Sequence, residues 1–186
     1  MAEDKKVNLP CMNIILLAVS SINGKITSGG NSNIYTWTSK EDQEIYFSHI
    51  NNAELICMGS KTYDAAKHLM VHRKGRVRVV FTRDKLKYEK DRIPGILEFT
   101  SDSPKKIITK YKKKGVRQAL VVGGGEINSL FLEQKLISEI HLTIEPVIFG
   151  KGKLFIEEVE VYERLKLMGV KTLNSNGTVQ LIYKVV

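Results

Sequence analysis

The sequence predicts a single α/β domain with a mostly parallel central sheet, an antiparallel C-terminal hairpin and helices on both faces. Three observations support this prediction. Strand-like and helix-like patterns alternate along the chain, the last two strand-like segments flank the turn pair Asn176-Gly177, and the length of 186 residues suits one domain. We therefore treat residues 1–186 as one unit, in which residues 1–11 form a flexible N-terminal extension.

The first half of the chain alternates apolar runs with amphipathic segments. Thr38 or Ser39 is expected to cap the first helix, because acidic residues follow within one turn. We expect strands over 14–20, 55–58, 76–82 and 96–99, helices over 40–50 and 60–68, and a Gly/Ser/Asn-rich loop over 21–37.

The second half continues the alternation and then closes with the hairpin. Pro104 and Gly115 are typical of the start and the end of a helix that Ser103 caps. We expect a further helix over 126–134 and strands over 118–122, 139–148, 161–172 and 178–185. Strands separated by helices pair in parallel, whereas the closing hairpin is antiparallel.

Composition narrows the class of protein. Apolar residues make up 42% and charged residues 26% of the chain, which is typical of a soluble globular protein. The apolar run over 14–19 is too short to span a bilayer. The N-terminus has no long apolar core of the secretory type, so we expect a cytoplasmic protein. In that compartment Cys11 and Cys57 are expected to be free and buried.

The charge balance indicates an anionic partner. Lysine and arginine number 29 against 20 acids, a net charge of +9. Such a field attracts polyanions, which include nucleic acid and a phosphorylated cofactor. Charge alone does not choose between them.

The expected first helix carries an acidic residue on its apolar face. Helical spacing places this residue on the same face as Ile45, Tyr46, His49 and Ala53. This residue is Asp42. A carboxylate that faces a core needs a partner or keeps its proton, which is a property of functional carboxyl groups. The alternative is that Asp42 completes a capping interaction with Ser39 in the first turn. Both readings stay open.

Two strand-glycine-helix segments are candidate anion or cofactor sites. Gly123, Gly124 and Gly125 follow a buried strand and open a helix, where backbone N–H groups point outward. The segment MGSKTYDAA repeats this arrangement, with hydroxyls from Ser60 and Thr62 and a charge from Lys61. The alternatives are a tight turn in the first case and an ordinary helix cap in the second.

Arginines flank the strand in GRVRVVFTRD. Arg76 opens it and Arg83 follows its end, so each can bind an anion. The alternative is a solvated edge. His68 and His72 stand four residues apart without a third ligand, so we expect no metal site.

Taken together, these segments resemble the dihydrofolate reductase superfamily between Ile14 and Phe155. The motifs that carry the resemblance are ICMGSKTYDAA, VVGGGEINSLFL and HLTIEP. The resemblance implies a dihydrofolate-reductase-like fold, NADPH as cofactor and hydride transfer to a small-molecule substrate. Two branches are relevant: the dihydrofolate reductases and the pyrimidine reductases of riboflavin biosynthesis.

Several residues resemble the folate branch. Trp37 precedes Asp42 by five positions, and Tyr46 follows one helical turn later. In that branch the acid anchors the pterin and promotes protonation of its N5. Arg76 matches the arginine that grips the carboxylate of the folate tail, and Thr143 matches the threonine that supports the acid.

Other segments resemble the pyrimidine branch, namely SINGKIT and EPVIFGKGKLF. Two of that branch's features are absent: an acid before the glycine triplet, where this chain has Val122, and an Ala-Asp-Asp-Pro run. Our main expectation is dihydrofolate reductase, which produces tetrahydrofolate. The alternative is a 5-amino-6-(5-phosphoribosylamino)uracil reductase. A basic nucleic-acid-binding domain is a distant third, because the chain has no nucleic-acid motif.

The resemblance assigns a role to particular residues. Asp42 is the expected catalytic group, and Ala18, Asp42, Tyr46, Arg76 and Thr143 are expected to bind the substrate. Ser60, Lys61 and Thr62 would meet the pyrophosphate or ribose phosphate of NADPH, and Arg83 with Thr82 its 2′-phosphate. The full expected cofactor set is Ala18, Ile26, Gly59, Ser60, Lys61, Thr62, Thr82, Arg83, Val122, Gly123, Gly124, Gly125, Glu126 and Ile127.

The resemblance also implies a cis Gly-Gly peptide bond in the glycine turn. It leaves the oligomeric state open between monomer and homodimer, because folate enzymes are often monomers and pyrimidine reductases tend to pair.

Overall fold

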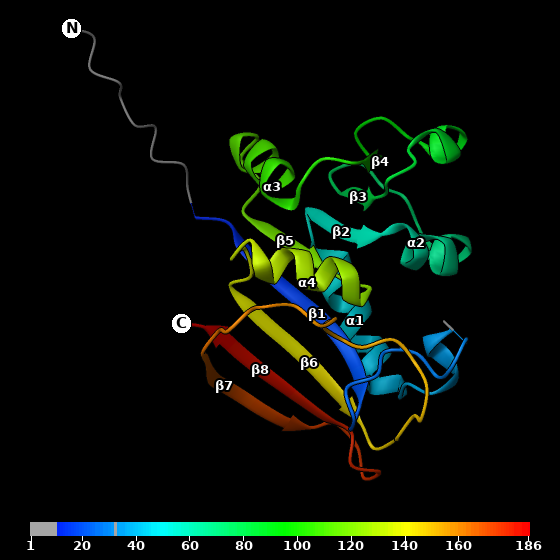
Figure 1. Ribbon diagram of the computed structural model, residues 1–186, viewed down its shortest axis with the longest axis vertical. Helices are drawn as coiled ribbons and strands as arrows, with labels where there is room; N and C mark the ends of the chain where they lie inside the picture. Colours follow the sequence, from blue (N-terminus) through cyan, green and yellow to red (C-terminus); the bar gives the residue numbers. More distant parts are fainter. Residues whose placement is uncertain (1–10, 32) are drawn as a thin grey trace, which may run out of the picture.

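An eight-stranded sheet in the order β4-β3-β2-β5-β1-β6-β8-β7 organises the chain (Figure 1). The computed structural model describes residues 11–31 and 33–186, so nearly all of the expected N-terminal extension lies outside the described residues. The strands are β1 (Asn13–Ser21), β2 (Leu55–Gly59), β3 (Val77–Phe81), β4 (Leu97–Thr100), β5 (Gln118–Val121), β6 (Glu139–Glu145), β7 (Leu165–Thr172) and β8 (Val179–Val185).

Four α-helices and three short 3-10 helices connect these strands. The α-helices are α1 (Lys40–Asn52), α2 (Ser60–Ala66), α3 (Pro104–Lys113) and α4 (Gly125–Glu133). The 3-10 helices are η1 (Ile34–Thr36), η2 (Lys67–Leu69) and η3 (Leu86–Asp91).

The strand directions confirm the predicted fold class. β4, β3, β2, β5, β1 and β6 pair in parallel, and β8 and β7 add two antiparallel strands at one edge. β1 lies between β5 and β6, although these strands come late in the chain. The carboxyl ends of the parallel strands therefore meet around β1, which is where open α/β sheets bind their ligands.

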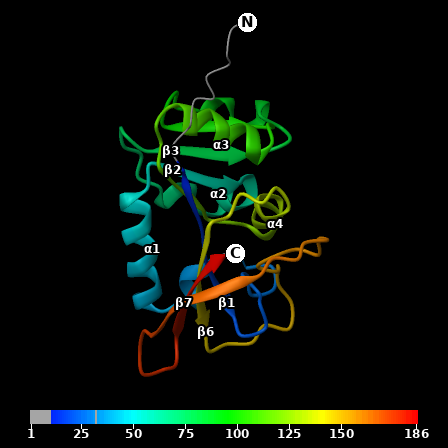
Figure 2. The ribbon, with the colours of Figure 1, turned by 90° about the vertical axis from the view of Figure 1, so that its left-hand side faces the viewer.

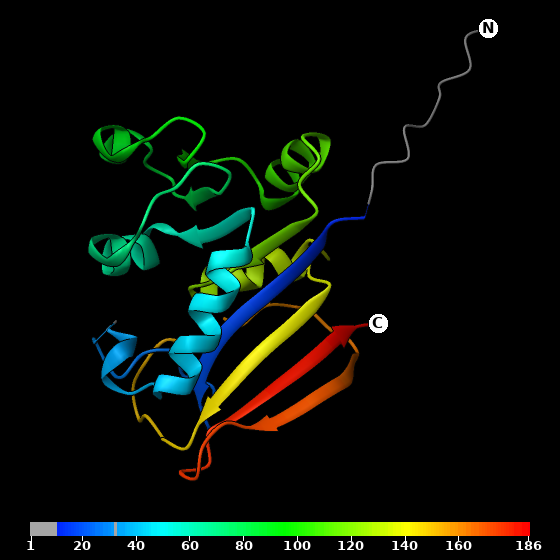
Figure 3. The ribbon, with the colours of Figure 1, turned by 180° about the vertical axis from the view of Figure 1, so that it is seen from behind.

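Helices cover both faces of the sheet, as predicted. In Figure 2, α1 lies on one side of the sheet, and α3 and α4 lie on the other. Figure 3 shows α1 alongside β1 on the face turned away in Figure 1. Alternation along β1 explains this arrangement, because Ile14 and Leu16 belong to the core under α3 and α4, while Ile15 and Leu17 belong to the core under α1.

Some element boundaries differ from the prediction. β6 ends at Glu145 and not at 148, because Pro146 has no N–H and Val147 N turns back to Glu145 O at 2.8 Å. β7 begins at Leu165 and not at 161, because Val161 packs against the core under α4. The helix expected over 60–68 is α2 followed by the 3-10 turn η2.

Other differences concern segments without apolar periodicity. η1, within the expected loop over 21–37, and η3 have no counterpart in the prediction, because a 3-10 turn is too short to show a period. Cys57 is buried as expected, but the expectation for Cys11 was wrong: it is exposed, because it precedes the first strand. Both thiols are free.

Gly125, at the start of α4, gives the first prediction. A Cβ there would overlap Leu154 O and lie 3.0 Å from Glu157 Oε1. We expect Gly125→Ala to lower the free energy of unfolding by about 1–3 kcal/mol, because backbone must shift to admit the methyl group. Urea denaturation measures this change.

The matched control is Gly150→Ala in the neighbouring loop. No atom lies within 4 Å of a Cβ at Gly150, so its unfolding free energy should be unchanged or slightly higher. Equal stability of the two variants would contradict the close approach of residues 154–157 to α4.

Candidate active site

Two glycine turns meet at the carboxyl ends of β2 and β5. Gly59 N donates to Gly123 O at 2.9 Å, and Val122 N donates to Cys57 O at 3.0 Å. The peptide bond between Gly123 and Gly124 is cis, as the resemblance implied. Gly123 has a φ of +98°, and no atom lies within 4 Å of its absent Cβ. Backbone without side chains therefore borders this part of the sheet.

Apolar and hydroxyl side chains close around these turns. A Cβ on Gly124 would lie 3.5 Å from Thr62 Oγ1 and 4.0 Å from Ile26 Cδ1. A Cβ on Gly59 would lie 3.0 Å from Ile127 Cγ1. The structure thus brings together residues of the expected cofactor set that lie as much as a hundred positions apart in the sequence.

Cations gather at the first turn of α4. Lys61 Nζ forms an ion pair with Glu126 Oε1 at 2.8 Å. The hydrogen bond from Lys61 lowers the pKa of Glu126, and the charges of Lys153 and Arg83 contribute in the same direction. Gly124 is the N-cap of α4 and offers no side-chain acceptor to the first N–H groups. This combination of free N–H groups and cations fits a phosphate-bearing cofactor.

Two expected cofactor residues face the chain itself. Thr82 Oγ1 accepts from Asp84 N at 3.2 Å and so forms part of a turn. Glu126, in the ion pair with Lys61, is the only acid in the first turn of α4. A ligand phosphate at this point would compete with the Glu126 carboxylate for Lys61.

Asp42 is buried between α1 and β6. Ser39 is the N-cap of α1, and its Oγ accepts from Asp42 N at 3.3 Å. The Asp42 side chain hydrogen-bonds with Thr143 of β6, and only 6% of the residue is exposed. Both alternatives from the sequence therefore hold at once: the cap uses the backbone N–H of Asp42, and the carboxyl group faces inward.

Burial raises the pKa of Asp42 from 3.8 to about 6. The hydrogen bond with Thr143 opposes this rise, and the negative charge of Glu145 adds to it. A carboxyl group of this kind exchanges its proton near neutral pH, which is a property of catalytic acids.

Strand register relates Asp42 to the glycine turns. Leu16 pairs with Val121, so Ala18 and Gly123 each lie two residues beyond a paired position. On its other side β1 pairs Val19 with Thr143, the partner of Asp42. Residues 18 and 19 of β1 therefore lie between Thr143, the partner of Asp42, and the glycine turn that follows β5.

Tyr46 links Asp42 to two buried arginines. Burial raises the pKa of Tyr46 to about 12. The charge of Asp42 also raises this pKa, whereas the charges of Arg78 and Arg76 lower it. Arg76 Nη1 donates to Ile50 O at 2.7 Å, and its Nη2 donates to Val71 O at 2.8 Å.

Arg78 Nη1 also donates to Val71 O, at 2.8 Å. Burial, followed by the charge of Arg76, lowers the pKa of Arg78 to about 10. Arg76 Nε is buried without a partner in the described part of the chain. The two guanidinium groups thus concentrate positive charge beside Tyr46.

Sequence reasoning missed Arg78, Lys153 and Glu145 at this site. Lys153, in the loop after β6, lies near enough for its charge to lower the pKa of Glu126, and no local pattern predicts this proximity. Glu145 lies two residues after Thr143 on the same face of β6, so the alternation in HLTIE could have identified it.

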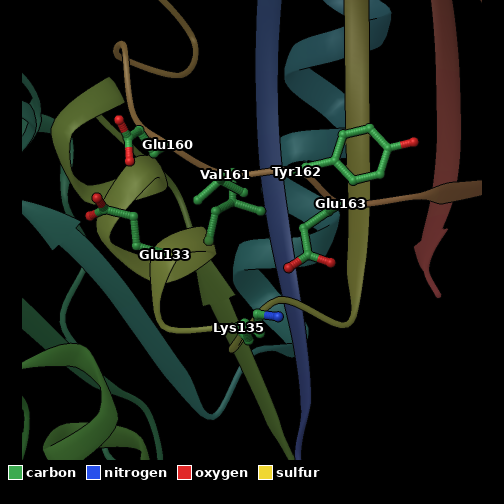
Figure 4. A pocket seen from close by; sticks show the side chains of 7 residues that line it. Glu133, Lys135, Glu160, Val161, Tyr162 and Glu163 are labelled. Atoms are coloured by element: carbon green, nitrogen blue, oxygen red, sulfur yellow. The ribbon is translucent and has the colours of Figure 1, made fainter.

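The pocket in Figure 4 is separate from the candidate active site. It has a volume of about 370 Å³ and lies between the end of α4 and the segment before β7. Glu133, Lys135 and Glu160 line it, and neither Asp42 nor the glycine turns do. We assign no role to it.

Two further observations concern the described residues. None of their helices has the length and apolarity needed to cross a membrane. Within 11–31 and 33–186, histidine, cysteine and acidic side chains do not form a group of three that could bind a metal ion.

Comparison with known proteins identifies the family. Residues 13–179 match the family model described as RibD C-terminal domain. The chain therefore belongs to the RibD C-terminal domain family. Reductase domains of this family use NADPH, in agreement with the expected cofactor. The match favours the pyrimidine-reductase branch over dihydrofolate reductase, which was our main expectation.

Individual proteins are similar to this chain over most of its length. The uncharacterized protein YyaP of Bacillus subtilis is 26% identical over 95% of this chain and 96% of its own length. A pyrimidine reductase-like protein from Corynebacterium diphtheriae is similar in structure, with a TM-score of 0.75, 18% identity, and coverage of 94% of this chain and 92% of its own.

A bifunctional enzyme from Thermotoga maritima shares the fold over part of its length. It is a diaminohydroxyphosphoribosylaminopyrimidine deaminase/5-amino-6-(5-phosphoribosylamino)uracil reductase, with a TM-score of 0.73 and 19% identity. The match covers 95% of this chain and 57% of the bifunctional enzyme. At these identities the two solved structures show the fold alone.

The pKa of Asp42 predicts a pH-dependent stability. Between 3.8 and about 6, the folded chain holds a proton that the unfolded chain has lost, so stability falls as pH rises through this range. We expect Asp42→Asn to be more stable than the wild type by roughly 1–3 kcal/mol at about pH 8, and little different near pH 3.5. Urea unfolding at both pH values tests this, and a difference independent of pH would contradict it.

Proposed function

We propose that this protein is an NADPH-dependent reductase of a pyrimidine with a phosphoribosylamino substituent. The observation that carries the proposal is the buried Asp42 carboxyl group beside Thr143 of β6, with β1 lying between β6 and the strand that leads into a glycine turn suited to the cofactor, in a chain of the RibD C-terminal domain family. The 5-amino-6-(5-phosphoribosylamino)uracil reductase activity named for the Thermotoga maritima enzyme supplies the substrate class.

The cofactor would lie along the two glycine turns. Gly59, Gly123 and Gly124 allow close approach, while Ile26 and Ile127 supply apolar surface for a nicotinamide ring. Lys61 and Arg83 offer positive charge to its phosphates. NADPH, when bound, supplies a hydride to the carbon that is reduced.

Asp42 would donate the proton that the sugar ring oxygen gains during the reaction. Reduction of a ribosylamine to an open-chain ribitylamine breaks the bond to the sugar ring oxygen, and this oxygen must gain a proton. A carboxyl group with a pKa of about 6 can hold that proton near neutral pH and deliver it within hydrogen-bond reach. Thr143 orients the Asp42 carboxyl group through its hydroxyl.

The buried arginines would serve the phosphate end of this substrate. Arg76 and Arg78 hold their guanidinium groups on the carbonyl of Val71, and neither forms an ion pair with a described carboxylate. The sequence suggested Arg76 for the carboxylate of a folate tail, and a phosphate suits the same cation.

Dihydrofolate is the second candidate substrate, and one observation favours it. Asp42 is supported by a threonine on β6, which is the arrangement that resembles the folate branch. A pterin would use the same carboxyl group to favour protonation of its N5. The two candidates differ in the group that reaches Arg76.

The rates of NADPH oxidation with the two substrates distinguish the two candidate functions. We expect NADPH oxidation with 5-amino-6-(5-phosphoribosylamino)uracil at a kcat/KM at least about tenfold above that with dihydrofolate, because one well-placed charged contact has this magnitude. Asp42→Asn should lower the rate by roughly a hundred- to ten-thousandfold at neutral pH. Faster turnover of dihydrofolate would reverse the assignment.

Glu44→Gln is the control for Asp42→Asn. Glu44 is exposed on the same helix, so its variant should keep the wild-type rate. A similar loss in both variants would indicate damage to α1 and not the removal of a proton donor.

Arg83 gives a prediction about the cofactor. Arg83→Ala should narrow the preference for NADPH over NADH by about tenfold or more, because a charge-assisted contact with the 2′-phosphate would be lost. Arg117→Ala, at the amino end of β5, is the matched control and should leave the ratio of the two KM values unchanged. An unchanged ratio in Arg83→Ala would remove Arg83 from the site.

A further inference from the structure

Glu145 is a buried carboxylate that the expected site does not include. Only 3% of the residue is exposed, at the end of β6. Its Oε1 accepts from Ser39 N at 2.7 Å, and its Oε2 accepts from Thr178 Oγ1 at 2.7 Å. It forms no ion pair with any cation in residues 11–31 and 33–186. An unpaired buried charge is costly, so its retention calls for a physical explanation.

The hydrogen bond with Ser39 connects Glu145 to Asp42. Ser39, which donates to Glu145, is the cap whose hydroxyl accepts from Asp42 N. Thr143, which bonds with the Asp42 side chain, lies two residues before Glu145 on the same face of β6. The start of α1 is thus held against β6 at two points, Ser39 with Glu145 and Asp42 with Thr143.

We propose that Glu145 is a positioning residue for Asp42: it anchors the first turn of α1 to β6 and places a fixed negative charge behind the Asp42 carboxyl group. The anchor determines where that carboxyl group lies relative to residues 18 and 19 of β1. The charge determines how readily Asp42 loses its proton.

Glu145 is the charged group whose effect on the pKa of Asp42 is resolved. On α1, Tyr46 is neutral at physiological pH and Glu41 bonds outward to Asn174. Around Glu145, the strand neighbours Ser21 and Thr178 and the cap Ser39 are all neutral. Arg76 donates to Ile50 O toward the other end of α1, and Arg78 shares the acceptor Val71 O with it. A like charge disfavours ionisation, so Glu145 reinforces the effect of burial on Asp42.

The β7–β8 hairpin supports the same turn from outside. Asn174 Nδ2 donates to Thr178 Oγ1 at 3.0 Å and to Glu41 Oε2 at 3.1 Å. Thr178 then donates to Glu145. The antiparallel edge of the sheet is therefore connected to the start of α1 through two acidic residues, Glu41 and Glu145.

Glu145→Gln removes the negative charge of this side chain and keeps its size. The amide oxygen can still accept from Ser39 N, and the amide nitrogen can donate to Thr178 Oγ1, so the contacts remain while the charge is lost. We expect the Asp42 pKa, measured by ¹³C NMR of labelled aspartate carboxyls and assigned with Asp42→Asn, to fall by roughly half a unit to one unit. An unchanged Asp42 pKa in a folded Glu145→Gln variant would overturn the proposal.

Thr178→Val is the matched variant that keeps the charge. It removes one donor from the Glu145 carboxylate, so the Asp42 pKa should be equal to or higher than in the wild type. A lower value would overturn the proposal, also in the case that Glu145→Gln does not fold.

A kinetic measurement extends the test and rests on the proposed function. With the substrate that the enzyme turns over, the limb of the kcat/KM profile that reports Asp42 should move to lower pH in Glu145→Gln by the same amount as the NMR value. The NMR titration needs no turnover, so failure of the proposed substrate would leave its outcome intact. A shifted NMR value with an unmoved kinetic limb would overturn the kinetic role of Glu145.

Discussion

The site depends on one constraint, which is the burial of a carboxyl group between a helix and a strand. Asp42 sits at the first turn of α1, where acids are favoured by the helix dipole, yet it is turned away from water. Its ionised form loses solvation there, and this loss is the largest cause of its raised pKa. The fold therefore carries a charge at some cost to stability, which is typical of groups kept for function.

Topology explains why that group and the two glycine turns lie at the same end of the sheet. The chain places β5 and β6 on either side of β1 after completing β2, β3 and β4. The glycine turns after β2 and β5 thereby come to the same end of the sheet as the start of α1. Side chains are absent at the glycine turns, and cations lie near the start of α4, which is the arrangement that the proposed cofactor site requires.

The polar side chains of β6 include the expected residue Thr143 and three residues that were not expected. Glu139, His141, Thr143 and Glu145 alternate along one face, toward α1. His141 contacts His49 of α1 at 3.4 Å, and Glu145 contacts Ser39 at the other end of the same helix. Polar contacts thus hold α1 at both ends, and the apolar contacts of Ile50 and Ala53 cover the sheet near its end. This explains how a helix with few buried apolar residues keeps Asp42 in a defined position.

The sequence by itself determined the alternation of strands and helices, the two glycine turns and the inward face of Asp42, because each depends on local periodicity or on the backbone freedom of glycine. Its resemblance to a superfamily was correct at that level, but residues such as Trp37 and Thr143 favoured the folate branch, whereas the family match favours the pyrimidine branch. Only the tertiary structure decided that Glu145 contacts Ser39 and Thr178, that the charge of Lys153 acts on Glu126 of α4, and that Arg76 is buried. Those contacts join segments far apart in the chain, so their energies depend on strand order and packing, which no local pattern of residues encodes.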